Sequence, residues 1–540
     1  MDPAAAIRAW TSAANLRHAI FAAGGFAAAL GFVHFVLPLP PEAPAAEFQR
    51  PAGGSGGGSG SGTGSSSSSG STDQLVLAQV VFRHGARTPL GKRYWPELGP
   101  KWDVCGQAFD AVPVEVTTED GKPRPANPDD EKQINVRYAG GCSKGELTLI
   151  GQEQAREFGR WLRWRYSMVY GLLPGSYQEG AVLGRTTNYS RTIATLQGVL
   201  SGLFPGTKQP IRVHTTEEID EILYSNIKSC RKLEQLMQQL HKQQKEELRH
   251  KGHPQHTEEL QQRVRAALGL PPDEKVHFVD LHDAMTTMLT HAKEIPPGLR
   301  DEAVLRGINH HATERFMLLI APHPDTGKDQ EVLRLGMGVL MHTMVGRMEA
   351  AAAAAQAGSS QAAASGGGAP AGGDAASASS GVSSLPAAAA PAGGANAAAP
   401  AALPPGQPRM FLYSGHDTSV MPLLAALGKR VENWPPYLSN LVLELWRRPS
   451  GGHYVKVLHN RSELPLTELC GSATCELQLF KDKVIGPYTL TRDQHRQECA
   501  LHFLHDQPAG EHTETVQVGS SFQESDSTAA SQAPAAPEEQ

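Results

Sequence analysis

Closely spaced arginine, histidine and glycine residues follow an apolar run at residues 75–82, which predicts a buried strand. Arg83 and Arg87 each carry a planar set of donors that matches phosphoryl oxygens and stays charged at any working pH. Between them, His84 offers a neutral ring nitrogen that could attack phosphorus and form a covalent intermediate. Gly85 removes a side chain where the backbone must approach the substrate. The group predicts a phosphate site with a nucleophile; the non-functional alternative is a strand end held by salt bridges.

Two further predicted strands also end in polar or cationic residues. Arg185 follows a short strand at residues 181–184. His416 and Asp417 follow another strand at residues 409–414, and a helix is expected directly afterwards. In open α/β sheets, ligands bind at the carboxyl ends of strands, where helix N-termini also present free N–H groups. We therefore expect the three strand ends to meet around one phosphate.

The expected chemistry needs a proton donor as well as cations. Asp417 suits a general acid that neutralises the departing alkoxide. It must then be protonated when the substrate arrives, a state that acidic conditions or a nearby phosphate dianion favour. His416 would add one more donor to the phosphoryl oxygens. The arginines already supply positive charge, so neither a metal nor a cofactor is expected.

The His-Asp dipeptide occurs three times, and its context separates the copies. Only His416-Asp417 follows a predicted strand, with a glycine before it and a helix after it. The copy at residues 282–283 lies in a helical stretch, where adjacent residues point about 100° apart. The copy at residues 505–506 precedes a polar tail. Surface or satisfied polar roles are expected for these other two copies.

The motif Arg-His-Gly-x-Arg-x-Pro at residues 83–89, together with the pair at 416–417, resembles the signature of the histidine acid phosphatases. This family is a branch of the phosphoglycerate-mutase-like superfamily, and the resemblance extends over residues 75–500 apart from a low-complexity stretch. It implies an α/β fold, in which a mixed, mainly parallel sheet is flanked by helices and carries an inserted helical cap domain. The implied reaction is hydrolysis of a phosphate monoester through a phosphohistidine.

The resemblance also implies a role for each candidate residue. His84 becomes the phosphate-accepting nucleophile and Asp417 the proton donor. The implied phosphate ligands are Arg83, Arg87, Arg185 and His416. Asn188 stands where many members of the family have aspartate.

Within the family, four segments look most like the lysophosphatidic acid phosphatases: residues 82–90, 202–205, 223–226 and 434–437. This implies a lysophospholipid phosphate as substrate. The alternatives are an inositol-phosphate phosphatase, a phosphotransfer mutase and a non-catalytic, membrane-tethered binding protein. A broadly basic pocket in the cap would favour inositol phosphates, and an apolar pocket would favour the lipid.

Residues 1–50 have the composition of a targeting or membrane-anchor segment. An apolar stretch at residues 19–37 is about long enough to cross a bilayer as a helix, and two arginines precede it. A single-pass anchor with a luminal catalytic domain fits the length and the charge. The alternatives are a cleaved secretory signal and a mitochondrial presequence, and the mitochondrial location of the related lysophosphatidic acid phosphatase supports the latter.

The remaining chain divides by composition. The expected parts are a Gly/Ser linker (51–72), two pieces of the α/β core (73–213 and 408–507), a helical cap (214–349), a disordered low-complexity insertion (350–407) and a disordered tail (508–540). Within the core, residues 91–140 are expected to be irregular, and Thr148 is a candidate N-cap for a following helix.

Overall charge and cysteine content bear on partners and compartment. The net charge of −6, with both signs interspersed, gives no footprint for nucleic acid. The six cysteines show no C-x-x-C pair and no metal-ligand spacing. They permit three disulfides, with Cys470 and Cys475 close enough in sequence to pair, but isolated buried thiols account for them equally well.

Overall fold

The structure, a computed structural model, describes residues 72–91, 94, 101–250, 254–365 and 407–500. The predicted anchor at residues 19–37 and the predicted tail at residues 508–540 lie outside these ranges, as does nearly all of the predicted linker. Within the described ranges, no helix has both the length and the apolar character that a membrane crossing requires.

A nine-stranded sheet forms the centre of the described chain, in the order β2-β4-β3-β5-β1-β6-β7-β8, with β9 pairing to β7. The strands from β2 to β1 in this order are parallel, and those from β6 onward are antiparallel. This confirms the predicted mixed sheet. The strands are β1 Gln74–Arg83, β2 Val114–Thr118, β3 Val182–Thr186, β4 Ile211–Thr215, β5 Met410–Gly415, β6 Asn440–Arg447, β7 His453–His459, β8 Ser462–Glu463 and β9 Cys475–Glu476.

The register of the three central strands sets the position of the site. Strand β5 lies between β1 and β3. Arg83 of β1 is level with Gly415 of β5, and Thr186 of β3 is level with Ser414. The carboxyl ends of all three strands therefore lie at one edge of the sheet, as the sequence predicts.

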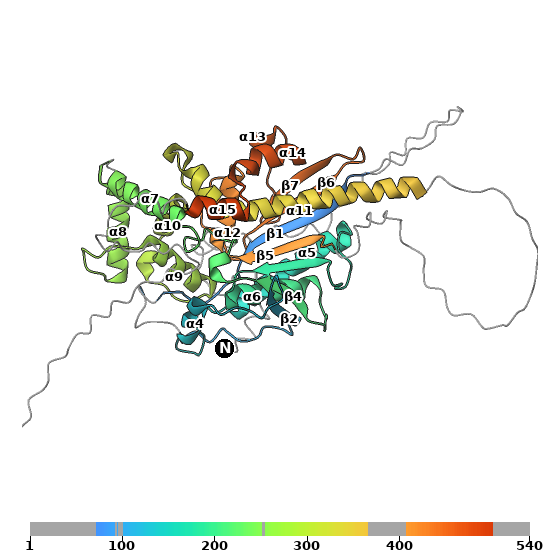
Figure 1. Ribbon diagram of the computed structural model, residues 1–540. Helices are drawn as coiled ribbons and strands as arrows, with labels where there is room; N and C mark the ends of the chain where they lie inside the picture. The colour runs from blue at the N-terminus through green and yellow to red at the C-terminus, as the bar shows by residue number, and fades with distance from the viewer. Residues whose placement is uncertain (1–71, 92–93, 95–100, 251–253, 366–406, 501–540) are drawn as a thin grey trace, which may run out of the picture.

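Helices cover both faces of the sheet and extend beyond one end of it (Figure 1). The α-helices are α4 Pro128–Asn135, α5 Leu149–Arg163, α6 Ser190–Leu203, α7 Arg231–His250, α8 Pro254–Leu268, α9 Phe278–Thr290, α10 Glu302–Ile320, α11 Asp329–Ser365, α12 Asp417–Ala426, α13 Thr467–Cys470, α14 Leu477–Leu479 and α15 Arg492–Ala500. Two π-helices, Trp164–Val169 and Phe480–Ile485, and four short 3-10 helices, Glu218–Asp220, Pro297–Leu299, Pro324–Thr326 and Gly486–Tyr488, complete the set within the described residues.

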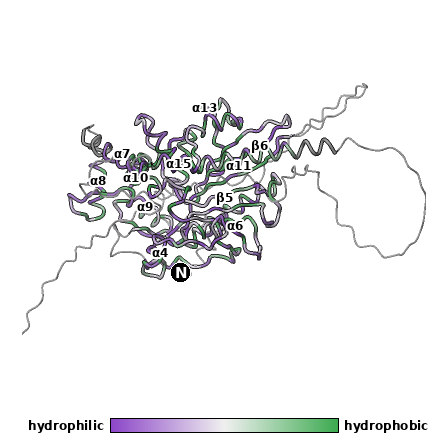
Figure 2. The backbone as a smooth tube through the Cα atoms, in the orientation of Figure 1, coloured by the Kyte–Doolittle hydropathy of each residue, from purple (hydrophilic) through white to green (hydrophobic). Residues whose placement is uncertain are grey.

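The two faces of the sheet have separate apolar cores. Helices α5 and α6 pack on one face, where Phe158 and Leu196 share a buried cluster with Phe82 of β1. Helices α11 and α12 pack on the other face, where Met341 and Val420 are buried. Strand β6 is predominantly hydrophobic and the outer helix α7 predominantly hydrophilic, which matches their positions (Figure 2). The predicted N-cap is confirmed, because the Thr148 side chain accepts a hydrogen bond from Gly151 N at the start of α5.

Helices α7 to α10 lie beside the carboxyl edge of the sheet, in the range where a helical cap was expected (Figure 1). Their apolar residues form two clusters of their own, one around α7 and the end of α10, the other around α8 and α9. Helix α11 begins beside this group and then runs along the sheet (Figure 1).

Two predictions about the irregular parts of the chain are wrong. The expected disordered insertion at residues 350–407 begins as the last turns of α11, which continues to Ser365 with Ala351 and Ala355 buried. Alanine is the strongest helix former, so a run that looks unstructured by composition extends a helix that already packs on the sheet. The expected irregular stretch at residues 91–140 contains β2 and α4, which are too short to give a clear periodic pattern.

All six cysteines form disulfides, in the pairs Cys105–Cys142, Cys230–Cys499 and Cys470–Cys475. The last of these is the pair whose short spacing suggested a bridge.

Candidate functional site

The loop after β1 is fixed by close packing against the first turn of α5. A Cβ atom on Gly85 would come within 2.5 Å of the carbonyl oxygen of Gly151, and one on Gly151 would come within 2.1 Å of the carbonyl oxygen of Ala86. The amide of Gly85 also donates to Thr195 Oγ1 in α6 at 3.1 Å. Gly85 is thus required for packing of the loop against a helix, a contact that the sequence did not reveal.

His84 lies in this loop, is buried, and is held in one tautomer. Its Nδ1 lies 2.9 Å from the carbonyl oxygen of Gly85. A carbonyl oxygen can only accept, so Nδ1 carries the proton and Nε2 keeps its lone pair. Burial lowers the pKa of His84 well below its usual value, and the charges of Arg191, Arg87 and Arg83 lower it further. Burial and the surrounding charges therefore favour a neutral imidazole whose Nε2 keeps its lone pair.

Arg83 is held by the neighbouring loop and by the predicted proton donor. Its Nη2 lies 3.1 Å from Asp417 Oδ2, and its Nη1 donates to the carbonyl oxygen of Pro435 at 2.5 Å. The guanidinium also lies over the ring of Tyr437, 4.5 Å from its centroid. These contacts fix the direction of the guanidinium and leave its buried Nε without a hydrogen-bond partner in the described part of the chain.

Arg87 binds a carboxylate from helix α9. Its Nη2 lies 2.7 Å from Asp283 Oδ1, and its Nη1 lies 3.3 Å from Asp283 Oδ2. Burial alone would raise the pKa of Asp283, but the charge and hydrogen bonds of Arg87, and then the charge of Arg83, lower it below the usual value. The carboxylate is therefore ionised.

Asp283 belongs to the His-Asp dipeptide for which a surface or satisfied polar role was expected. Its neighbour His282 packs its ring against Trp434, with centroids 5.1 Å apart. Both residues lie at the site because the cap folds over the strand ends. Nothing in the sequence near residue 282 indicates that long-range contact.

His416 and Asp417 stand at the start of α12, which follows β5. His416 Nε2 lies 3.0 Å from Thr187 Oγ1, and the His416 and His84 rings have centroids 5.6 Å apart. Burial lowers the pKa of His416 well below its usual value, and Arg191 and two further arginines lower it further. Asp417 accepts hydrogen bonds from its neighbour's amide at 2.9 Å and from Trp434 Nε1 at 2.8 Å. Its position in the first turn of α12 also places it at the positive end of the helix dipole.

Arg185, predicted as a phosphate ligand, faces a buried carboxylate. Its guanidinium forms a buried pair with Glu221, at 3.0 and 3.3 Å, and also donates to the carbonyl oxygen of Thr186. A buried arginine that faces a buried carboxylate is satisfied as a structural ion pair.

Arg191, in the first turn of α6, lies over the ring of Tyr189, which in turn packs against the ring of His416. It is the cation with the largest effect on the pKa of both His84 and His416. Its own pKa falls to about 10, first through burial and then through the charge of Arg87. Its Nη1 donates to Gln133 Oε1 at 2.9 Å. The rule that ligands bind at strand ends favoured Arg185. Arg191 stands six positions later, in the helix that follows the strand.

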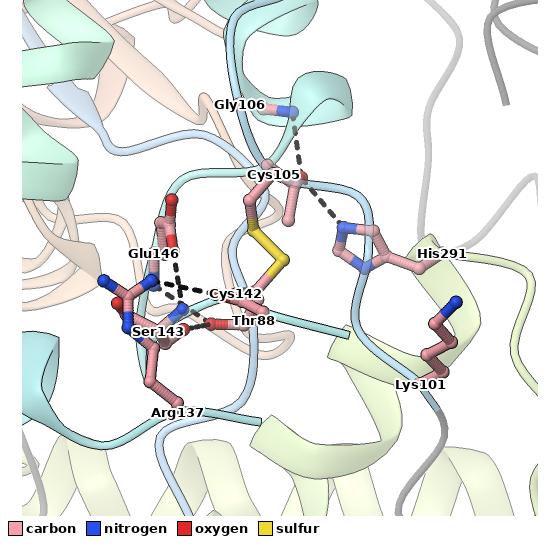
Figure 3. The surroundings of a disulfide bond; sticks show 12 residues. Thr88, Lys101, Cys105, Gly106, Arg137, Cys142, Ser143, Glu146 and His291 are labelled. Carbon is pink, nitrogen blue, oxygen red and sulfur yellow. Dashed lines mark hydrogen bonds between the residues drawn. A yellow bond between two sulfur atoms is a disulfide. The ribbon is translucent and has the colours of Figure 1, made fainter. Parts of the chain in front are cut away.

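A second loop supports the residue after Arg87 (Figure 3). Thr88 Oγ1 donates to the carbonyl oxygen of Ser143 at 2.6 Å, and the amide of Thr88 donates to the carbonyl oxygen of Glu146 at 3.0 Å. The Cys105–Cys142 disulfide lies directly beside these contacts. His291, the residue that follows α9, reaches the same region, and its Nε2 lies 2.8 Å from Thr148 Oγ1. Core and cap are therefore joined next to residues 84–90, the loop that follows β1 and carries His84 and Arg87.

A small cavity opens beside Arg83, between α9, α10 and the loop before β6. Most of its lining is apolar, and Arg83 is its single cation. The lining residues are Arg83, His282, Met285, Thr286, Leu289, Leu305, Ile308, Asn309, Asn433, Trp434, Pro435 and Pro436. Trp434 belongs both to this cavity and to the hydrogen bond with Asp417, so the cavity lies next to the predicted proton donor.

Among solved structures, a phytase from Hafnia alvei in its apo form aligns with 80% of this chain and 99% of its own, with 15% sequence identity and a TM-score of 0.47. Among curated proteins, human lysophosphatidic acid phosphatase type 6 is 26% identical over 433 residues, which cover 79% of this chain and 86% of that protein. Bovine lysosomal acid phosphatase is 24% identical over 351 residues, 62% of this chain and 68% of that protein.

The sequence model of the histidine phosphatase superfamily (branch 2) matches residues 74–460, which include the strand ends, the phosphate-binding loop and the cap described above. Because this match covers well over half of the chain, the protein belongs to the histidine phosphatase superfamily, branch 2.

Proposed function

We propose that this protein hydrolyses phosphate monoesters through a phosphohistidine on His84, with a lysophospholipid phosphate such as lysophosphatidic acid as its substrate. The family and its acid phosphatase members indicate that the protein is a phosphoric monoester hydrolase. The observation that carries the proposal is the state of His84, a buried neutral imidazole with its Nε2 lone pair free and three arginines around it.

In the proposed first step, His84 Nε2 attacks phosphorus, so that an N–P bond forms as the ester O–P bond breaks. Arg83, Arg87 and Arg191 hold the equatorial oxygens and stabilise their charge, which accounts for most of the rate in phosphoryl transfer. His416 is a further ligand of the phosphate. Because the pKa of His84 is depressed, the nucleophile stays neutral at pH values where an exposed histidine is protonated. This suits activity in acid.

Asp417 supplies the protons for both steps. Its proton passes to the leaving oxygen as the first O–P bond breaks. In the second step the Asp417 carboxylate takes a proton from water as the water oxygen bonds to phosphorus and the N–P bond breaks. Phosphate leaves, and both residues return to their starting states. The hydrogen bonds from Trp434 and the neighbouring amide keep the carboxyl directed at the site.

The lysophospholipid part of the proposal has two supports. The cavity beside Arg83 and Trp434 is lined mainly by Leu, Ile, Met, Pro and Trp side chains, which suit an apolar leaving group. The human relative is named as a lysophosphatidic acid phosphatase and is similar over most of both chains. An inositol phosphate would call for a broadly basic pocket, whereas this lining holds a single cation.

We also infer that the catalytic domain works in an oxidising, luminal compartment, with residues 1–50 acting as a signal or single-pass anchor. The domain has three disulfides, of which Cys230–Cys499 joins residues 269 positions apart, and such bonds persist in the secretory pathway but are rare in reducing compartments.

Substitution of the nucleophile tests the covalent step. A His84→Ala variant should lose about a thousandfold or more in kcat for p-nitrophenyl phosphate, because no other group can accept the phosphoryl. Wild type that is quenched in alkali during turnover of 32P-labelled substrate should carry label, and His84→Ala should carry none. His342→Ala, at an exposed histidine of α11, is the control and should behave as wild type. Equal labelling of wild type and His84→Ala would refute the phosphohistidine.

Substitution of Asp417 tests the proton donor. An Asp417→Asn variant should lose about a hundredfold or more in kcat/KM for lysophosphatidic acid, whose alkoxide needs a proton to leave. The loss should be far smaller for p-nitrophenyl phosphate, because nitrophenolate leaves without one. The comparison uses kcat/KM because this constant reports the phosphorylation step and not the later hydrolysis of the phosphohistidine, in which Asp417 acts as a base. Steady-state kinetics on both substrates give the comparison, and equal losses would show that Asp417 is not the acid.

Localisation tests the compartment. A fusion of the full chain to a fluorescent protein should reside in the secretory pathway or lysosome, with its domain protected from protease added outside the organelle. A version without residues 1–50 should lose this location. Import into the mitochondrial matrix, with reduced cysteines, would overturn the luminal assignment.

A further inference from the structure

Helix α9 of the cap places a negative charge on a phosphate-binding arginine. Asp283 holds Arg87 through both of its carboxylate oxygens, at 2.7 and 3.3 Å. The Arg87 side chain is 4% exposed and that of Asp283 25%. The arginine of the ion pair is thus buried, whereas its carboxylate is partly exposed.

Asp283 belongs to helix α9, which also supplies side chains to the lining of the leaving-group cavity. His282, the preceding residue, lines that cavity and packs against Trp434. Trp434 in turn donates to Asp417, the proposed proton donor. Arg83 pairs with Asp417 and also lines the cavity, so the cavity adjoins the proposed proton donor.

The charges in this region act differently on the two ends of a substrate. The transferred phosphoryl meets Arg83, Arg87 and Arg191, which outnumber the two carboxylates paired with them, Asp417 and Asp283. The leaving group meets the apolar cavity, whose single cation is already paired with Asp417. Asp283 is partly exposed beside Arg87, on the same helix α9 that lines this cavity. A second anionic group on the substrate would therefore meet the field of this carboxylate in partly buried space, where repulsion is strong.

We propose that Asp283 is a specificity-determining residue that excludes polyanionic phosphate esters and admits monoesters with a neutral or apolar leaving group. The inference rests on the proposed function, because it assigns the substrate class of that same site. It also explains why the ion pair uses a residue of the cap: the cap covers the leaving group, while the core holds the phosphoryl.

A purely structural role makes a different prediction. If Asp283 only orients Arg87, its removal weakens the grip on the phosphoryl of every substrate, and all substrates lose activity together. If it selects by charge, its removal changes the ratio between substrates. The ratio of kcat/KM values is therefore the informative readout.

The test compares 1-oleoyl-glycerol 3-phosphate, p-nitrophenyl phosphate and myo-inositol hexakisphosphate as substrates of the full chain. In Asp283→Asn, kcat/KM for the hexakisphosphate divided by that for the lysophospholipid should rise about tenfold or more. Inorganic phosphate should inhibit this variant at lower concentration than wild type, because Arg87 loses its competing anion. Asp283→Ser should shift both readouts in the same direction, and it replaces Asp283→Asn if that variant does not fold.

Two controls separate local from general charge effects. Asp283→Glu keeps the charge, so its substrate ratio should stay within about threefold of wild type. Glu294→Gln removes one exposed carboxylate just beyond α9, which changes the net charge equally and should leave the ratio unchanged.

The outcomes are distinct. Equal losses on all substrates, or an unchanged ratio in Asp283→Asn and Asp283→Ser, would overturn the selective role while leaving the phosphatase activity in place. An equal shift in Glu294→Gln would show that overall charge is responsible, which also overturns it. A wild-type protein that hydrolyses none of the three esters would overturn the proposed function itself.

Discussion

The structure depends on the burial of three guanidinium groups around one uncharged imidazole. Each buried ion loses its hydration, a loss that costs about several kcal/mol and must be offset by partners. Arg83 is paired with Asp417 and Arg87 with Asp283, while Arg191 has the Gln133 amide as a hydrogen-bond partner and a pKa lowered to about 10. These partners neutralise only part of the positive charge. A bound phosphate dianion would stabilise the remaining charge, and the rigidly held arginines would in turn stabilise the transition state.

Two kinds of packing keep these charges in place. The register of β1, β5 and β3 puts three strand ends at one level, and the glycine-to-glycine approach between the phosphate-binding loop and α5 fixes the backbone of His84. The cap adds a second set of contacts through Asp283, which pairs with Arg87, whereas Arg83 is held by Asp417 and Pro435 of the core. Core and cap therefore hold different arginines of one site.

Sequence reasoning succeeded where function depends on local order along the chain. Residues 83–87 and 416–417 are adjacent to strong strand signals, and the rule that ligands bind at strand ends brought them together correctly. The same rule named Arg185, which pairs with Glu221, and it did not name Arg191, which lies in the following helix and which we propose as the third phosphate ligand. Sequence reasoning also gave Asp283 no part in the site. Nothing in the sequence of a helix indicates that one of its carboxylates will contact the loop of Arg87 after folding.

The central claim is that side chains from separate strand ends form one phosphate pocket behind which His84 is aligned. A crystal structure of the protein with orthovanadate tests this most directly. We expect vanadium bonded to or in line with His84 Nε2, its equatorial oxygens held by Arg83, Arg87 and Arg191, and the apical oxygen opposite His84 facing Asp417. Vanadate bound away from His84, or held by Arg185 in place of Arg191, would contradict the account.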